Sequence, residues 1–359
     1  MVDSKQAPLD SAAAAKAAFA SVQDKPFPDD IFTAPELRWA VIGCGVIANQ
    51  MAQSLALAGR KLAGVANRTL SKAQAFAEQY GIEKVYESVE DLYADPGIDA
   101  VYITTPHNTH ITYLRDALAA GKHVLCEKAI TLNSAELDEA RAIADEHNVV
   151  LMDATTVLHM PLYQELRRRM DAGEFGRMNL AQLNFGSYKE YGDLTNRFYN
   201  RNLAGGAMLD IGVYALSVMR LFMASQPIEV VSLGNTCETG VDVAGGIVCR
   251  NAEQQLGVVS LTLHSKQPKR SIISFDKCYI EVNEYPRADH ATIVWTADGH
   301  REEVHAGTEA YALCYEMADL EKAVVGDDSK RELLDYASDV MELMTKLRAD
   351  WGVVYPEEE

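Results

Sequence analysis

An apolar strand that runs directly into two closely spaced glycines constrains this chain more than any other stretch. Residues 38–48 read Arg-Trp-Ala-Val-Ile-Gly-Cys-Gly-Val-Ile-Ala, and helix-forming residues follow without a proline or a polar break. Gly43 permits a sharp turn, Gly45 has no Cβ to obstruct a pyrophosphate, and the small Ala48 lets the new helix pack closely while its free N–H groups face the phosphates. We therefore predict a dinucleotide-binding turn of the form G-x-G-x-x-A, with cofactor contacts from Gly43, Gly45, Val46, Ile47 and Ala48.

The residues after this turn continue an alternation of strands and helices. Two glycines between a strand and a helix can also serve only to allow a tight turn and close packing, so the surrounding sequence decides the interpretation. Residues 61–66 form a second short apolar run, and apolar residues at 73, 76, 77 and 80 recur at helical spacing. Further strands are expected at 84–86, 99–105, 122–126 and 149–152. The alternation predicts a parallel, doubly wound sheet whose ligands gather at the carboxyl ends of its strands.

The position that usually reads the cofactor ribose carries no acid. An NAD-preferring fold places a carboxylate about twenty residues after the glycines, whereas this chain has Asn67-Arg68-Thr69 there. Arg68 offers a planar, permanently charged guanidinium to a 2′-phosphate. The alternative is a solvated arginine at a helix start, where a cation opposes the macrodipole. We predict NADP as the cofactor, with NAD possible, and contacts from Asn67 and Arg68.

The length of 359 residues exceeds what one core usually supports, so two domains are expected. We predict an N-terminal arm at 1–36, a Rossmann cofactor domain at 37–154 and a substrate and oligomerisation domain at 155–359. Alternating runs beyond residue 160 predict a mainly antiparallel sheet, which makes the chain an α/β protein. The arm either covers the Rossmann domain, reaches a neighbouring subunit or forms a frayed tail.

Charge and cysteine content narrow the possible partners and the compartment. A net charge of −19 argues against nucleic acid and anionic membrane surfaces. The six cysteines form no C-x-x-C pair and no metal-ligand spacing, so we expect reduced, mostly buried thiols. No apolar run approaches the roughly eighteen residues that cross a bilayer, and the N-terminus lacks the apolar segment of a signal peptide. We expect a cytoplasmic protein.

Polar residues collect where two of the predicted parallel strands end. Lys128 follows the 122–126 strand, where a nicotinamide and its substrate would meet, and its ammonium can polarise a carbonyl or hold an alcohol. The alternative is a loop lysine paired with Glu127. His107 and His110 invite a metal, but two histidines without a third ligand are weak support, and we expect none. The predicted residues of the cofactor groove are Thr105, Pro106, His107, Asn108, His110, Glu127 and Lys128. The alternative for His110 is a satisfied residue at the helix start.

A nearly apolar helix from about residue 205 to 223 carries a carboxylate and a phenol. Asp210 and Tyr214 are four residues apart and therefore share one helix face. Their structural alternatives are a helix-capping acid and a core tyrosine with a satisfied hydroxyl.

Together these motifs resemble the glucose-fructose oxidoreductase, inositol dehydrogenase and MocA family, written Gfo/Idh/MocA, from about residue 37 to 356. The matching stretches are G-x-G-x-x-A at 43–48, T-P-x-x-x-H at 105–110, G-K-H-V-L-C-E-K at 121–128, G-G-A-x-L-D-I-G-V-Y at 205–214 and G-V-V-Y-P at 352–356. The tyrosine at 214, where inositol-dehydrogenase-like members have a histidine, resembles the branch that contains dimeric dihydrodiol dehydrogenases and NADP-dependent xylose dehydrogenases. The resemblance implies a Rossmann domain, a large open C-terminal sheet that commonly forms a dimer interface, and reversible hydride transfer at a carbinol carbon.

Carried onto this chain, the resemblance makes Lys128 the group that polarises the reacting oxygen, Tyr214 the acid/base and Asp210 a residue that positions substrate or tunes the pair. Arg197 is a further candidate for substrate or cofactor contact. Two departures from the family pattern affect the pocket. Ala129 replaces a proline that would fix the loop beside Lys128, and Leu158 stands where relatives have an arginine.

We therefore predict an NADP-dependent oxidoreductase that acts on a CH–OH group of a sugar, polyol or related cyclic alcohol. The alternative is a non-catalytic NAD(P)-binding sensor on the same scaffold, which the altered loop at Ala129 leaves open and the retained Lys128, Asp210 and Tyr214 argue against. The expected partners are a small-molecule substrate and further copies of the chain, as a homodimer or homotetramer through the C-terminal sheet.

Overall fold

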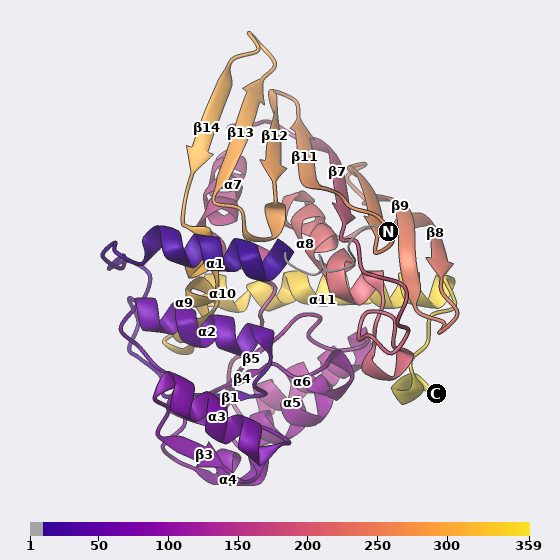
Figure 1. Ribbon diagram of the computed structural model, residues 1–359. Coiled ribbons are helices and arrows are strands. Elements are labelled where there is room, and N and C mark those ends of the chain that lie inside the picture. Colours follow the sequence, from indigo (N-terminus) through magenta and orange to yellow (C-terminus); the bar gives the residue numbers. More distant parts are fainter. Residues whose placement is uncertain (1–9) are drawn as a thin grey trace, which may run out of the picture. The chain divides into compact units, whose positions relative to one another are not determined.

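The computed structural model describes residues 10–359, so the first nine residues of the predicted arm lie outside the described part. The chain forms two compact units (Figure 1). Of the described residues, unit 1 comprises 10–130, 136–154 and 309–334, and unit 2 comprises 131–135, 155–308 and 335–359. Each unit has its own sheet.

The sheet of unit 1 is parallel throughout, in the order β3-β2-β1-β4-β5-β6. This confirms the predicted doubly wound Rossmann sheet. Its strands are β1 (Trp39–Ile42), β2 (Gly64–Ala66), β3 (Lys84–Tyr86), β4 (Ala100–Ile103), β5 (His123–Cys126) and β6 (Leu151–Asp153). Its helices include α2 (Val46–Leu57), α3 (Leu70–Tyr80), α4 (Val89–Ala94), α5 (His110–Ala119) and α6 (Ser134–Glu146). β1 and β4 are fully buried, as expected for strands covered on both faces.

The boundary prediction for the second domain was wrong for residues 309–334, which belong to unit 1. This segment contains η6 (Glu309–Tyr311), α9 (Ala312–Val324) and α10 (Asp328–Arg331). The apolar face of α9, including Leu313, Met317 and Leu320, joins the core beneath α2, and the two helices lie side by side in Figure 1. Glu321 of α9 adds polar contacts: its buried carboxylate accepts a hydrogen bond from Trp39 Nε1 at 3.1 Å and forms an ion pair with Arg60. Burial of this face holds the returning helix in unit 1.

The described part of the arm packs on unit 1, the first of the three positions considered for it. Helix α1 (Asp10–Val22) contacts η6. Val22 and Ile31 are buried, and the Phe27 ring lies 4.9 Å from the Tyr311 ring in an edge-on arrangement. Apolar burial explains why the arm folds back on its own unit.

Unit 2 is built on a mixed sheet in the order β14-β13-β12-β11-β7-β10-β9-β8. β7 and β10 run parallel and the other neighbours antiparallel, so the predicted mainly antiparallel sheet is confirmed. The strands are β7 (Met178–Gly186), β8 (Glu229–Thr236), β9 (Asp242–Arg250), β10 (Leu256–Thr262), β11 (Gln267–Phe275), β12 (Cys278–Asn283), β13 (His290–Trp295) and β14 (Arg301–His305). Helix α8 (Val213–Phe222) packs on one face, and α7 (Pro161–Asp171) and most of α11 (Leu333–Asp350) also belong to this unit.

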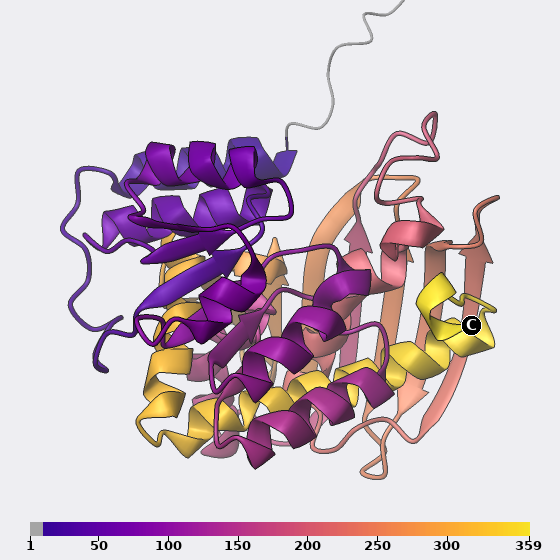
Figure 2. The same ribbon diagram turned by 90° about the horizontal axis from the view of Figure 1, so that it is seen from below.

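Two strands of this sheet were not predicted. β14 is a polar edge strand, and β9 contains Gly245 and Gly246, which normally indicate a turn. The structure explains Gly245 by a close contact, since a Cβ on Gly245 or on its cross-strand partner Gly234 would lie 2.3 or 2.2 Å from the Trp351 ring. The C-terminal residues lie beside β8 and β9 in Figure 2, so these glycines form a slot for the indole.

One segment corrects the expectation about apolar length. Residues 201–222 are long and apolar enough to cross a membrane by composition, but 83% of the most apolar window is buried inside the protein. Its apolarity is therefore that of a core helix beneath a sheet.

Candidate active site

The glycine turn after β1 has the geometry that a dinucleotide requires. Gly43 has a φ of 102° and donates its N–H to the Ala66 carbonyl at 2.9 Å, and a Cβ there would lie 2.6 Å from Thr104 Oγ1. At the start of α2, a Cβ built on Gly45 would meet open space among the described residues. Ala48 is fully buried, whereas Val46 is exposed. The first N–H groups of α2 are therefore accessible to an anionic ligand.

Arg68 lies just beyond the carboxyl end of β2, before the N-cap residue Thr69 of α3. The residue is exposed, and within residues 10–359 it forms no ion pair. Asn67 donates from Nδ2 to the Thr69 carbonyl at 3.0 Å, which closes the turn around Arg68. An unpaired guanidinium beside the glycine turn is available to an anionic group on the cofactor.

The loop that carries Lys128 is held through its backbone by two histidines. His107 Nε2 lies 3.0 Å from the Lys128 carbonyl oxygen. The His110 ring is fully buried, with Nδ1 3.0 Å from the Ala129 carbonyl oxygen and Nε2 2.8 Å from that of Thr105. Burial lowers the pKa of His110, against the opposing effect of these carbonyls. His110 thus ties the end of β4 to the loop after β5, which favours the structural alternative over direct cofactor contact.

The remaining predicted residues of unit 1 lie in the loops after β4 and β5. The Thr105 hydroxyl accepts from Thr109 Oγ1 at 2.8 Å, Pro106 is exposed, and Asn108 is half-buried. Glu127 accepts from the Lys128 N–H at 3.2 Å and from the Tyr102 hydroxyl. The peptide bond between Lys128 and Ala129 is cis. Tyr102 was missed by sequence reasoning, because a tyrosine within a buried strand gives no indication that its hydroxyl reaches a loop beyond the neighbouring strand.

Unit 2 carries the other predicted residues. Asp210 lies in a π-helical turn, η4 (Met208–Gly212), which continues into α8 and Tyr214. The Asp210 side chain is largely buried and lies 3.6 Å from the exposed Arg197 guanidinium, which stacks 4.2 Å over the Phe198 ring. Tyr214 is half-buried, with its ring 6.1 Å from that of Phe185. The structure therefore brings Arg197 to Asp210, and a π-turn at such a position is frequent at functional sites.

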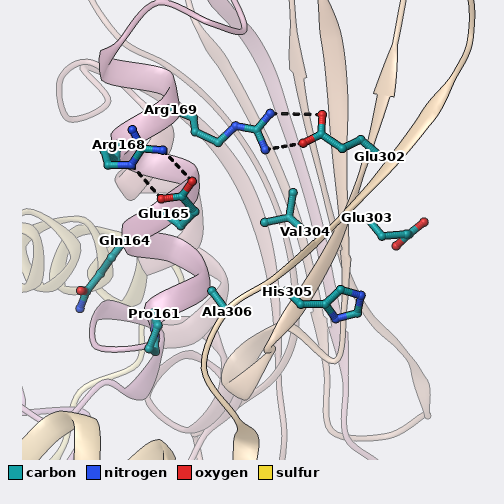
Figure 3. Close-up of a pocket in the computed structure, with 10 residues that line it drawn as sticks. All are labelled: Pro161, Gln164, Glu165, Arg168, Arg169, Glu302, Glu303, Val304, His305 and Ala306. Atoms are coloured by element: carbon teal, nitrogen blue, oxygen red, sulfur yellow. Dashed lines mark hydrogen bonds and ion pairs between the residues drawn. The ribbon is translucent and has the colours of Figure 1, made fainter. Parts of the chain in front are cut away.

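Two further features of unit 2 are Leu158 and a groove that contains none of the predicted site residues. Leu158 is buried in η2 (Thr156–Leu158), which packs against α8. A cavity of about 650 Å³ lies between α7 and β14 (Figure 3). Its arginines are paired, Arg168 with Glu165 and Arg169 with Glu302, and none of the predicted site residues lines it. We therefore do not place the active site in this groove.

Comparison with protein families gives a match in each unit of the chain. Residues 37–155 match the oxidoreductase family with an NAD-binding Rossmann fold, named GFO_IDH_MocA. Residues 163–281 match the C-terminal domain of the same family.

Individual relatives extend the match over most of the chain. The mouse trans-1,2-dihydrobenzene-1,2-diol dehydrogenase is 32% identical over 254 residues, which cover 69% of this chain and 75% of that protein. A 3-ketoreductase from Actinomadura kijaniata, solved with NADP and TDP-benzene, is 24% identical with a TM-score of 0.75, covering 88% of this chain and 98% of that chain. A levoglucosan dehydrogenase, solved with NADH and levoglucosan, is 19% identical with a TM-score of 0.76, covering 87% and 97%.

Proposed function

Because the chain belongs to the Gfo/Idh/MocA family of oxidoreductases, we propose that it is an NADP-dependent enzyme that transfers hydride to or from a carbinol carbon of a cyclic alcohol, such as a sugar, polyol or dihydrodiol. The observation that carries the proposal is the placement of Lys128. It follows β5 at the carboxyl edge of a Rossmann sheet, in a loop whose backbone two histidines hold. Ligands of such sheets bind at that edge.

The residues of unit 1 fit a dinucleotide. The first N–H groups of α2 bind the pyrophosphate behind Gly43 and Gly45, and Arg68 pairs with the ribose 2′-phosphate. When bound, the nicotinamide supplies the hydride acceptor or donor. This chain contributes position and proton handling. Lys128 donates a hydrogen bond to the reacting oxygen and stabilises the negative charge that develops on it during oxidation of the alcohol.

The residues of unit 2 handle the proton and the substrate. Tyr214 takes the hydroxyl proton in the oxidative direction and returns it in the reductive direction. Asp210, together with Arg197, binds further substrate hydroxyls and fixes the ring orientation. The relatives support this substrate class, since the mouse enzyme is named for a cyclic diol and one structural neighbour was solved with levoglucosan.

The direct test is turnover across a panel of cyclic alcohols. Purified protein is mixed with NADP⁺ and aldoses, inositols, levoglucosan or a trans-dihydrodiol, and NADPH absorbance is followed with Lys128→Ala in parallel. An absorbance rise with the wild type alone is expected. Binding of NADP without turnover of any substrate, in either direction, would contradict the proposal and favour the sensor alternative.

The cofactor preference has a separate test. Arg68→Ala is expected to raise the Kd for NADP by about 10- to 100-fold, because a charged hydrogen bond contributes about 1.5–3 kcal/mol, and to leave the Kd for NAD nearly unchanged. Lys61→Ala is the control, since Lys61 is an exposed cation of unit 1 that pairs with Glu83. Equal losses for both cofactors would contradict the role of Arg68.

We also propose that unit 2 forms the homo-oligomer through the free face of its sheet. Val231 and Leu233 on β8 are 75% and 83% exposed, and Val231 lies opposite the exposed Val248 of β9. Adjacent exposed apolar side chains on a sheet indicate an interaction surface. Leu233→Lys is expected to reduce the mass measured by light scattering to that of a monomer, whereas Val325→Lys, at an exposed valine of unit 1, leaves the mass unchanged.

The six unpaired cysteines fit a reducing compartment, and we propose the cytoplasm. Fractionation of cells that produce the protein tests this location.

A further inference from the structure

A buried carboxylate lies at the start of the helix that carries Asp210 and Tyr214. Asp242 is the first residue of β9, and its side chain is fully buried. Its Oδ2 accepts a hydrogen bond from the Met208 N–H at 2.6 Å. Met208 precedes Asp210 by two residues, in the first turn of the helix, where backbone N–H groups have no partner within the helix. Asp242 therefore supplies an acceptor to the helix that holds the proposed acid/base.

The two glycines of the G-G-A-x-L-D motif fit around this contact. Gly206 has a φ of 127°, and a Cβ there would lie 2.3 Å from Asp242 Oδ1. A Cβ on Gly205 would lie 2.6 Å from the Arg197 carbonyl oxygen. The Tyr355 hydroxyl donates to the Gly205 carbonyl at 2.7 Å. The glycines thus let the backbone approach both the carboxylate and the segment that carries Arg197.

The charged and titratable groups that face Asp242 come from the C-terminal part of the chain. Arg348 of α11 is buried, interacts favourably with the Asp242 carboxylate and pairs with Glu358 at 2.8 Å. Tyr355 is buried, its ring lies 4.7 Å from the Arg348 guanidinium, and its pKa is raised by burial and by the charge of Asp242. Burial raises the pKa of Asp242 to about 6, although the Met208 N–H and Arg348 oppose this shift.

A buried charge needs an explanation when an uncharged side chain of the same shape has the same acceptor. An asparagine at 242 also places an oxygen near the Met208 N–H, without the desolvation of a carboxylate. The charge makes the hydrogen bond about twice as strong and complements the positive end of the helix dipole. These effects fix the first turn, where Asp210 lies.

We propose that Asp242 is a positioning residue for the catalytic helix, and that its ionised form holds Asp210 and Tyr214 in the orientation that turnover requires. The inference rests on the proposed function, because it assigns Asp210 and Tyr214 to substrate and proton transfer. Protonation of Asp242 weakens the contact with Met208 and lowers turnover without removing either reacting side chain. The acid limb of the pH profile then belongs in part to a residue that does not touch the substrate.

The test compares wild type with Asp242→Asn. The variant is expected to lower kcat about 10-fold at pH 7, with a smaller change in KM and an unchanged Kd for NADP, and to lose the acid limb near pH 6 from the profile of kcat. Asp276→Asn, at an exposed carboxylate in the turn between β11 and β12, is the matched control and retains the limb. A variant with kcat within twofold of wild type and the same acid limb overturns the proposal.

A measurement on the wild type covers the case in which Asp242→Asn does not fold. The protection factor of the Met208 amide in hydrogen exchange, corrected for intrinsic pH dependence, is expected to fall as pH drops through about 6. Constant protection between pH 5 and 7 overturns the proposal without reference to activity. Failure of the proposed function is recognised separately, since the wild type would then bind NADP without turnover of any cyclic alcohol, whereas the exchange measurement does not depend on turnover.

Discussion

In both proposed halves of the active site a side chain contacts the main chain, but the main-chain group is a carbonyl oxygen in unit 1 and an N–H group in unit 2. In unit 1, histidine side chains bond backbone carbonyl oxygens of the Lys128 loop. In unit 2, an aspartate side chain accepts a backbone N–H at the start of the Asp210 helix. In both cases the contact is with main-chain atoms and not with the side chain that is proposed to react. Each fixes the main chain beside a residue that is proposed to act on the substrate.

The difference lies in what each holding group does to stability. A neutral buried imidazole has one N–H, which it donates to a single carbonyl oxygen without a net charge, whereas a buried carboxylate carries a desolvation penalty that its hydrogen bonds offset only in part. The pKa shifts reflect this, since burial lowers the pKa of His110 and raises that of Asp242. The two supports therefore respond to pH in opposite directions.

The largest expected effect tests whether the two halves act on one reaction. Lys128→Ala and Tyr214→Phe are each expected to lower kcat by about 10²–10⁴-fold, the range for loss of acid/base assistance. Residues that act on the same oxygen are strongly non-additive, so the double variant should be little slower than the slower single variant. Steady-state kinetics with unchanged NADP binding as the control provides the measurement. Fully multiplicative losses would show that the two residues serve separate steps.

Substitution of Gly206, beside Asp242, should destabilise unit 2. Gly206→Ala places a Cβ in a left-handed region and against the Asp242 carboxylate. Strain of about 1–3 kcal/mol and overpacking of about 1–3 kcal/mol should lower the free energy of unfolding by about 2–6 kcal/mol. Gly246→Ala is the matched control, because its Cβ meets open space. Equal stability of both variants in urea would mean that the backbone near Asp242 is not tightly fixed.

Much of the fold was predictable because its signals are local. The Rossmann strands and the buried helix of Asp210 each follow from periodicity or from one short motif, and the structure has them where they were expected. The residues that would bear the chemistry stand at strand ends or in a glycine-flanked helix, and such positions can be found from the sequence.

The features that were missed depend on partners distant in the sequence. Glycines in β9 look like a turn until Trp351, about a hundred residues later, fills the space above them. The helix α9 returns to unit 1 because its apolar face matches a core built before residue 155. Asp242 acts on a backbone N–H, 34 residues away, and a main-chain donor has no residue type that sequence could reveal.

Removal of the imidazole should disrupt unit 1 in the corresponding way. His110→Ala removes the single N–H that the neutral ring donates to the buried carbonyl of Thr105 or Ala129, and a buried acceptor left unsatisfied costs about 1–3 kcal/mol. We expect a loss of about 1–3 kcal/mol in unfolding free energy and a fall in kcat, since the backbone beside Lys128 loses this support. His147→Ala, at an exposed histidine of unit 1, is the control. Normal kcat in a destabilised His110→Ala would show that the ring supports the fold but not the aim of Lys128.

The smallest expected effect is in the pH dependence of the free energy of unfolding, which should change in opposite directions for Asp242 and His110. Asp242 has a folded pKa of about 6, above the ordinary 3.8, so the folded state binds more protons between these values. Its contribution to the free energy of unfolding therefore falls as pH rises from about 4 to 6, by up to about 3 kcal/mol at 1.36 kcal/mol per pKa unit. The lowered pKa of His110 acts in the opposite direction, because the unfolded state then binds the extra proton and stability falls on acidification below about 6.5. Urea unfolding between pH 4.5 and 7 should show a wild-type minus Asp242→Asn difference that decreases with pH, and a wild-type minus His110→Ala difference that increases. A pH-independent difference for either variant would mean that its group keeps an ordinary pKa in the folded state, and that the two halves of the site are not distinguished by charge.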